Sequence, residues 1–252
     1  MTGISVTLDR AAFRYGDMEM LFDIRFEAGG LYAVMGPSGA GKTTLLNLVA
    51  GFETPRSGRI LFDDRDMTRT GPDRRPVSMI FQENNLFAHL TVRTNIALGL
   101  RPDGRTTAED DRRIRETLER TGLTGLEGRL PGELSGGQRQ RVALARALLR
   151  DRPVMLLDEP FAALGPALRR DMLEFVAEIH RERGFTIVMV THLPEDALAI
   201  AEHVVFMDEG HILACAPPVE MPALARSLPQ LARYLGSPST DPCHMHEEPP
   251  QT

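Results

Sequence analysis

Residues 29–52, GGLYAVMGPSGAGKTTLLNLVAGF, decide the fold of this chain. The apolar run at residues 31–35 predicts a buried strand, and residues 43–50 carry apolar side chains at helical spacing. Between them, residues 36–43 fit the pattern G-x-x-x-x-G-K-[ST] at every position, in the strand-to-helix setting that the pattern requires. The stretch therefore predicts a glycine-rich phosphate-binding loop between a strand and a helix.

The residue types in this loop suit phosphate chemistry. Glycines let successive backbone N–H groups turn toward one anion, and the positive end of the following helix adds to the attraction. Lys42 is the only lysine among 29 basic residues, and its compact ammonium can reach phosphates where a planar guanidinium would not fit. Thr43 offers a hydroxyl to Mg²⁺, and Thr44 can line the loop. The loop alone leaves kinases, GTPases and motor ATPases open.

A second anion site is predicted at residues 134–138, LSGGQ, which precede apolar residues at helical spacing. Ser135 is a suitable N-cap, and the two glycines leave the N–H groups of the first turn uncovered.

Acidic and imidazole side chains follow two further apolar strands. Residues 154–157 end at Asp158 and Glu159, and residues 185–190 lead to His192. Because both runs have the pattern of buried parallel strands, we expect these side chains at the carboxyl edge of the sheet, where ligands bind. There Asp158 can hold Mg²⁺ through water, as the corresponding acid does in P-loop NTPases.

The order of these motifs resembles the nucleotide-binding subunit of ATP-binding-cassette (ABC) transporters, over about residues 8–212. The resemblance implies an α/β fold: a P-loop NTPase core of ABC ATPase type, with an antiparallel β edge and a helical signature subdomain. It also implies an enzyme that hydrolyses ATP to ADP and phosphate and couples this to transport.

The resemblance assigns roles to single residues. It implies that Glu159 is the general base, that His192 is the switch histidine, and that Gln82 contacts Mg²⁺ and the attacking water. The expected Mg²⁺ ligands are Thr43, Gln82 and Asp158. The expected ATP contacts are Tyr15 at the adenine, Gly36, Pro37, Ser38, Gly39, Ala40, Gly41, Lys42, Thr43 and Thr44 in the loop, and Ser135, Gly136, Gly137 and Gln138 in the signature.

The signature would serve the ATP of a second copy of the chain. A P-loop and a signature helix at opposite ends of one fold cannot bind the same γ-phosphate, so two copies are expected to meet head to tail around two ATP molecules. The expected organisation is a nucleotide-binding core at residues 1–82 and 151–216, a helical signature subdomain at 83–150, and a short helix and disordered tail at 217–252. Within that region one helix is expected at about residues 224–235, and residues 203–213 are expected to form one strand.

Composition limits the partners. The net charge is −6, so nothing global attracts nucleic acid, and no nucleic-acid partner is expected. No apolar run approaches the roughly 20 residues of a membrane span, and the N-terminus lacks a signal-peptide core. The resemblance implies a peripheral protein on the cytoplasmic face of the inner membrane, bound to polytopic permease subunits and indirectly served by a periplasmic solute-binding protein.

The solute is suggested only by similarity between subfamilies. The segment FQENNLFAHLTV and the segment GFETPRSGRILFDDRDMT look most like the ATPase of bacterial thiamine importers, and apolar Leu86, Phe87 and Leu90 suit a groove for a permease helix. The chain also ends soon after the core, whereas many importer ATPases for iron(III), sulfate or polyamines are longer. Importers of those solutes, exporters and soluble ABC ATPases stay open as alternatives.

Two features depart from a plain family pattern. Where the family has Ser-Ala-Leu-Asp after Asp-Glu-Pro, this chain has phenylalanine at 161 and then Ala-Ala-Leu-Gly, so the usual interface Asp is replaced by Gly165. Gly165 precedes a proline and is predicted to be a helix N-cap, so the change is expected to affect a contact across the dimer and not the helix. In the tail, Cys243, His244 and His246 could form a soft metal site, although a disordered tail is favoured.

Overall fold

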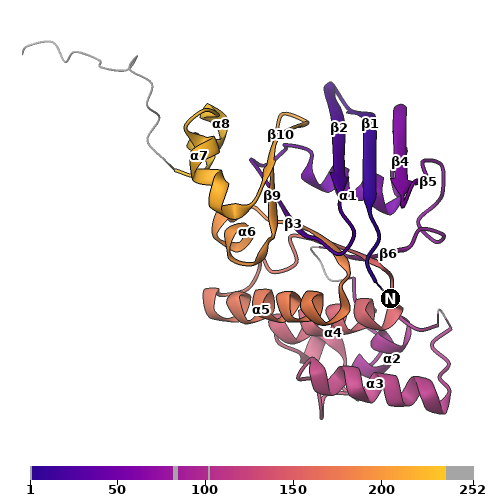
Figure 1. Ribbon diagram of the computed structural model, residues 1–252. Coiled ribbons are helices and arrows are strands. Elements are labelled where there is room, and N and C mark those ends of the chain that lie inside the picture. Colours follow the sequence, from indigo (N-terminus) through magenta and orange to yellow (C-terminus); the bar gives the residue numbers. More distant parts are fainter. Residues whose placement is uncertain (1, 82–84, 102, 237–252) are drawn as a thin grey trace, which may run out of the picture.

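The computed structural model describes residues 2–81, 85–101 and 103–236, which form one sheet with helices packed on both sides (Figure 1). The strands are β1 Val6–Tyr15, β2 Met18–Phe26, β3 Leu31–Met35, β4 Ser57–Phe62, β5 Arg65–Asp66, β6 Val77–Ile80, β7 Val154–Asp158, β8 Thr186–Val190, β9 His203–Asp208 and β10 His211–Ala216. The α-helices are α1 Lys42–Ala50, α2 Val92–Ala97, α3 Ala108–Arg120, α4 Gly136–Arg150, α5 Pro166–Arg183, α6 Pro194–Ile200, α7 Met221–Ala225 and α8 Pro229–Tyr234. Two 3-10 helices are η1 Pro131–Glu133 and η2 Pro218–Glu220.

The strands of the described residues follow the order β5-β4-β1-β2-β10-β9-β3-β8-β7-β6. The section from β9 to β6 is parallel, whereas β1, β2, β4 and β5 pair antiparallel to one another. The two sections join through β10, which pairs antiparallel with β9 and contacts β2 at a single register pair, His211 with Leu21. The predicted α/β fold with an antiparallel edge is confirmed.

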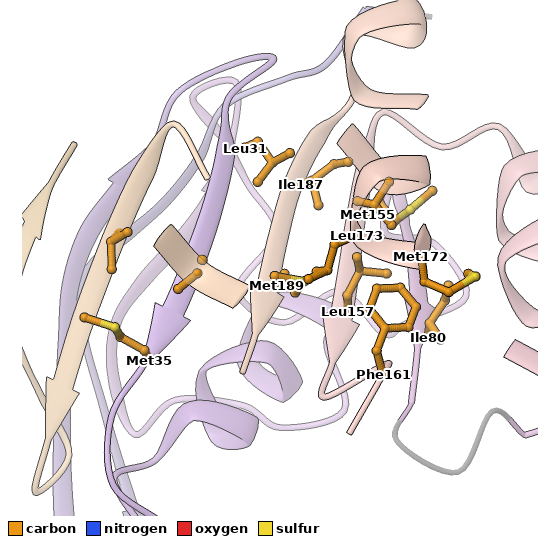
Figure 2. Packing of buried hydrophobic residues seen from close by; sticks show 14 of the residues in the cluster. Leu31, Met35, Ile80, Met155, Leu157, Phe161, Met172, Leu173, Ile187 and Met189 are labelled. Carbon is orange, nitrogen blue, oxygen red and sulfur yellow. The ribbon is translucent and has the colours of Figure 1, made fainter. Parts of the chain in front are cut away.

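Successive side chains of the parallel strands pack alternately into two separate hydrophobic cores. In β7, Val154 and Leu156 pack with the buried leucines of α1, whereas Met155 and Leu157 pack with α4 and α5. Figure 2 shows the second set, in which Leu157, Met189 and Phe161 lie against Met172 and Leu173 of α5. Since successive residues of a strand point to opposite faces, α1 and α4 lie on opposite faces of the sheet.

A third core lies among the helices between β6 and β7. Val92 and Ile96 of α2 pack against Ile114 and Leu118 of α3 and against one side of α4. The other side of α4 belongs to the sheet core, so this helix joins the two regions. The described part of the insert is helical, as the sequence predicted.

Two local predictions were wrong. Residues 203–213, expected as one strand, form the hairpin of β9 and β10, because Glu209 and Gly210 both have positive φ (43° and 80°) and make a tight two-residue turn. The single helix expected at about 224–235 is two short helices, α7 and α8. Pro229 separates them, because proline has no N–H for a continuing helix and starts α8 at its first position.

Among the described residues, no helix combines the length and the apolar character needed to cross a membrane.

Candidate nucleotide-binding site

The glycine-rich loop joins the end of β3 to α1, as predicted. Gly36 has φ 152° and approaches β9 so closely that a Cβ would lie 2.0 Å from the carbonyl oxygen of Met207. Gly41 has φ 93° and is the N-cap of α1, with no side chain capping the first turn. The middle of the loop, Pro37 to Gly39, is exposed. The backbone N–H groups at the start of α1 are therefore presented to solvent with glycine geometry, as an anion site requires.

Lys42 lies across the loop. Its side chain is buried, and Nζ donates hydrogen bonds to the carbonyl oxygens of Gly36 and Pro37, both at 2.8 Å. Burial lowers the pKa of the Lys42 ammonium, and the carboxylates of Glu159 and Asp158 oppose that shift. The only lysine of the chain thus places its charge against the loop that is predicted to bind phosphate.

Thr43 and Asp158 bring two oxygen ligands together. The Thr43 hydroxyl donates to the Asp158 carboxylate, with Oγ1 and Oδ1 3.2 Å apart. Asp158 ends β7 in a buried position, and this burial raises the pKa of its carboxyl group against the effect of the Thr43 hydrogen bond. Thr44 is half-buried behind Thr43.

This oxygen pair fits Mg²⁺ bound together with a nucleotide. Hydroxyl and carboxylate oxygens are the hard ligands that Mg²⁺ prefers, and the ion usually keeps several waters and takes only one or two carboxylates from the protein. Accordingly, the described residues contain no group of three or more His, Cys, Asp or Glu side chains that could hold a metal by themselves.

Glu159 and His192 meet beside these residues. Glu159 has φ 43°, a conformation that turns its side chain away from the direction of β7, and its backbone N–H donates to Val190 at the end of β8. His192 follows β8 by two residues, and its Nδ1 lies 3.1 Å from Glu159 Oε2. Because β7 and β8 are parallel neighbours, their carboxyl ends deliver both side chains to one place, as the sequence predicted.

Tyr15 is the last residue of β1 and is 72% exposed. An exposed aromatic ring at a strand end is free to stack on a flat ligand. Gln82, predicted as a ligand of Mg²⁺, lies outside the described residues, as does the Cys-His-rich tail.

The signature forms the start of α4. Ser135 is its N-cap, with Oγ accepting from the Gln138 N–H at 3.3 Å and the Ser135 N–H donating to Gln138 Oε1 at 2.9 Å. Gly136 is exposed, whereas Gly137 is buried so closely that a Cβ would lie 2.4 Å from a methyl carbon of Leu168. The structure does not bring these residues to the glycine-rich loop of the same chain, because α4 and α1 cover opposite faces of the sheet.

Gly165 is the N-cap of α5, followed by Pro166 at the first helical position, as predicted. Its φ and ψ are −64° and 158°, which any residue can adopt, and a Cβ there would meet nothing within 4 Å. The local fold therefore does not require glycine at this position.

Two residues of this region carry no motif and were missed by the sequence. Arg75 is fully buried and donates to the carbonyl oxygens of Leu48 and Val49 at 2.5 and 2.8 Å, so it closes the C-terminal end of α1. Burial lowers the pKa of Arg75 to about 10. Tyr234, in α8, donates from its hydroxyl to the carbonyl oxygen of His192 at 2.9 Å. Both contacts join distant segments, so neither leaves a local pattern in the sequence.

Two aromatic rings pack together at a small cavity that precedes the residues predicted to contact a membrane partner. Phe52 and Phe81 lie with ring centroids 5.6 Å apart and, with Met79, line a cavity of about 170 Å³, which Asp73 and Arg150 also line. Phe87 is 48% exposed, but Leu86 packs against the sheet and helical cores. Leu86 is only partly buried there, so its contribution to a groove for a permease helix stays a prediction.

Comparison with known proteins gives one consistent family. The ABC transporter family profile matches residues 21–162. The thiamine import ATP-binding protein ThiQ of Mesorhizobium japonicum is 59% identical over 212 residues, 84% of each chain. ThiQ of a Chelativorans species is 53% identical over 93% of this chain and 95% of its own.

The likeness extends to solved structures. The ATP-binding cassette MJ0796, solved as a dimer in a post-hydrolysis state with ADP and phosphate, matches with a TM-score of 0.74 at 28% identity, over 84% of this chain and 98% of that one. The glycine-rich loop and the whole signature lie within the matched region 21–162. The chain therefore belongs to the ABC transporter family.

Proposed function

We propose that this chain is the ATP-hydrolysing subunit of a thiamine importer. The observation that carries the proposal is the meeting of Lys42, the Thr43–Asp158 pair and the Glu159–His192 pair at one edge of the sheet. The solute is suggested by the relatives, which are named as thiamine import ATP-binding proteins at 49–59% identity. Import of another solute, such as iron(III), a polyamine or sulfate, is the alternative.

Binding of ATP uses groups that the chain already holds in place. The N–H groups of the glycine-rich loop and the first turn of α1 surround the phosphates, and Lys42 exchanges its two backbone carbonyl partners for phosphate oxygens. Tyr15 stacks on the adenine. Thr43 and Asp158, with Gln82, would hold Mg²⁺, which would neutralise charge on the phosphates.

Hydrolysis uses the carboxylate of Glu159 as a general base. The carboxylate orients a water in line with the γ-phosphorus and takes its proton as the oxygen–phosphorus bond forms and the bond to the β-phosphate oxygen breaks. ADP leaves with the bonding electrons, and phosphate is the other product. His192 Nδ1 fixes the Glu159 carboxylate from the other side at 3.1 Å, so that the remaining oxygen can face the water.

A second copy of the chain would complete each site. The first turn of α4 is exposed at Ser135 and Gly136 but lies on the face of the sheet opposite to α1. Ser135, Gly136, Gly137 and Gln138 would therefore close on the γ-phosphate of an ATP bound by the partner, in a head-to-tail dimer with two ATP molecules between the copies.

The membrane partner would bind the surface around Phe52 and Phe81. The exposed ring of Phe52 beside the cavity suits the apolar face of a short permease helix, and Phe87 adds a further exposed ring. The chain would then lie on the cytoplasmic face of the inner membrane, held there by its permease, with a periplasmic binding protein delivering the solute.

Uptake of labelled thiamine tests the solute. A strain lacking the gene should take up less thiamine, the wild-type gene should restore uptake, and a Glu159→Gln gene should not. Uptake that is unchanged by the deletion would refute thiamine as the cargo, whereas ATP hydrolysis by the purified chain tests the enzymatic part separately.

A further inference from the structure

The C-terminal helices pack against the sheet close to the nucleotide site. Met221 of α7 and Leu231 of α8 are fully buried and share a core with Met35 and Phe206. Met35 is the residue before Gly36, and it pairs in register with Phe206 of β9. The segment after β10 is therefore attached to the strands that carry the glycine-rich loop (Figure 1).

Tyr234 reaches from this segment to the predicted switch residue. Its ring packs against Phe206, with centroids 5.5 Å apart and planes at 46°, and its hydroxyl donates to the carbonyl oxygen of His192 at 2.9 Å. Burial raises the pKa of the Tyr234 hydroxyl. This hydroxyl connects the C-terminal segment to the backbone of His192.

The ring of His192 has little packing of its own. Its side chain is 45% exposed, and the contact to Glu159 is made by Nδ1 alone. The direction in which this ring points therefore depends on the backbone of residues 191–193. That backbone is held by the Thr191 N–H to Val34, by the Leu193 N–H to Thr191 Oγ1, by the N–H groups of Asp196 and Ala197 in α6 to the Leu193 carbonyl oxygen, and by Tyr234. Of these bonds, only the one from Tyr234 is made to the backbone of His192 itself.

We propose that Tyr234 is a positioning residue for ATP hydrolysis: it fixes the backbone of His192 so that the imidazole holds Glu159 in the orientation needed by the attacking water. The proposal rests on the proposed function of Glu159 and His192. It makes the C-terminal segment a part of the hydrolytic site, although Tyr234 itself touches neither the water nor the γ-phosphate.

The substitution Tyr234→Phe tests this, because it keeps the ring against Phe206 and removes the hydroxyl alone. Loss of one neutral hydrogen bond that orients a reacting group should lower kcat about fivefold. The KM for ATP and the midpoint of thermal unfolding should change little, since the nucleotide contacts and the packing are kept.

Tyr32→Phe is the matched control. Tyr32 is the other tyrosine whose hydroxyl bonds to the backbone at 2.9 Å, to the N–H of Glu27, and it lies at the first half of β3, away from the loop. This variant should lose some stability and keep the wild-type kcat. Equal loss of kcat in both tyrosine variants would overturn the proposal, because it would indicate a general structural effect.

A double-mutant cycle locates the effect. In a His192→Ala background, Tyr234→Phe should cause no further loss of kcat, because the hydroxyl acts through residue 192. A full additional loss there would contradict the proposal. A wild-type kcat in the single variant would also contradict it.

A measurement without turnover separates this proposal from the proposed function. The imidazole NMR signals of His192, assigned with His192→Ala, should shift in Tyr234→Phe and not in Tyr32→Phe. If the signals do not move, the proposal is wrong even if the chain hydrolyses ATP. If they move in a chain that does not hydrolyse ATP, the coupling stands and the proposed function fails.

Discussion

Helices α1 and α4 both begin at a glycine-containing motif, but their N-terminal ends are capped differently. At α1 the N-cap is Gly41 in a left-handed conformation, and no side chain caps the first turn. At α4, Ser135 and Gln138 bond to each other's backbone N–H groups and close the first turn. The chain therefore leaves the first turn of α1 without a side-chain cap, whereas in the first turn of α4 it caps the N–H of Gln138 itself.

This difference suggests that the N-terminal ends of α1 and α4 have different roles in the binding of phosphate. An open first turn beside a buried ammonium can bind phosphate strongly within one chain. A capped first turn has fewer free donors, so its contribution to phosphate binding would come later, when a partner brings the γ-phosphate to Ser135 and Gly136. Substitutions at the α1 side should therefore change chemistry or nucleotide binding, whereas those at the α4 side should change hydrolysis without changing binding by a single chain.

The largest effect is expected from Glu159→Gln on the α1 side. The amide cannot take a proton from water, so kcat for ATP hydrolysis should fall by roughly 10²–10⁴-fold. Binding of a fluorescent ATP analogue should persist, because Lys42 and the loop are unchanged. Substantial remaining hydrolysis would exclude Glu159 as the general base.

Gly136→Asp tests the α4 side. A Cβ at Gly136 has room, with the nearest atom 3.8 Å away, and an acid in the first turn of a helix stabilises it by about 0.3–1 kcal/mol. The folded chain should thus be as stable as the wild type and bind ATP equally well. The carboxylate should nevertheless repel the partner's γ-phosphate and reduce hydrolysis about 100-fold, because it changes the charge of a phosphate site. Normal hydrolysis in this variant would mean that α4 does not meet ATP.

The substitution Asp158→Asn, also on the α1 side, should change the stability of the chain and its ATP hydrolysis in opposite directions. Burial raises the pKa of Asp158, so the charged carboxylate costs the unbound fold stability at neutral pH, and the cost disappears as the pH falls through the raised pKa. The amide should stabilise the nucleotide-free chain at pH 7, with the gain shrinking on acidification. Urea unfolding at pH 7 and at lower pH measures this, and a gain that grows on acidification would contradict it. Mg²⁺-dependent hydrolysis should be lost at the same time.

The smallest effect is expected from Gly165→Asp. The backbone accepts the side chain, and an acidic N-cap is favoured over glycine by only a few tenths of a kcal/mol. If the missing acid normally links the two ATP sites, restoring it should raise the turnover or the cooperativity of hydrolysis. Kinetics identical to the wild type would show that this chain does not use the contact.

The features that were predicted well from the sequence are those determined by consecutive residues. The loop from Gly36 to Thr43 combines strand, glycines and helix in one stretch, and Glu159 and His192 follow apolar runs whose parallel pairing brings them together. The sheet and the N-caps Ser135 and Gly165 were predictable for the same reason.

The remaining features depend on contacts between distant residues. Tyr234 reaches His192 across 42 positions, and Arg75 reaches Leu48 across 27, so neither contact leaves a local pattern. The hairpin at Glu209 and Gly210 was missed because a positive φ at a glutamate is uncommon.

The most direct test of the divided site is to mix two inactive variants. Lys42→Ala removes the phosphate-binding charge of one copy, and Gly136→Asp blocks the signature of another. In a mixed head-to-tail dimer, one of the two sites combines the intact loop of the Gly136→Asp chain with the intact signature of the Lys42→Ala chain. The account predicts that ATP hydrolysis, nearly absent in each variant alone, reappears on mixing; a mixture as inactive as its components would contradict it.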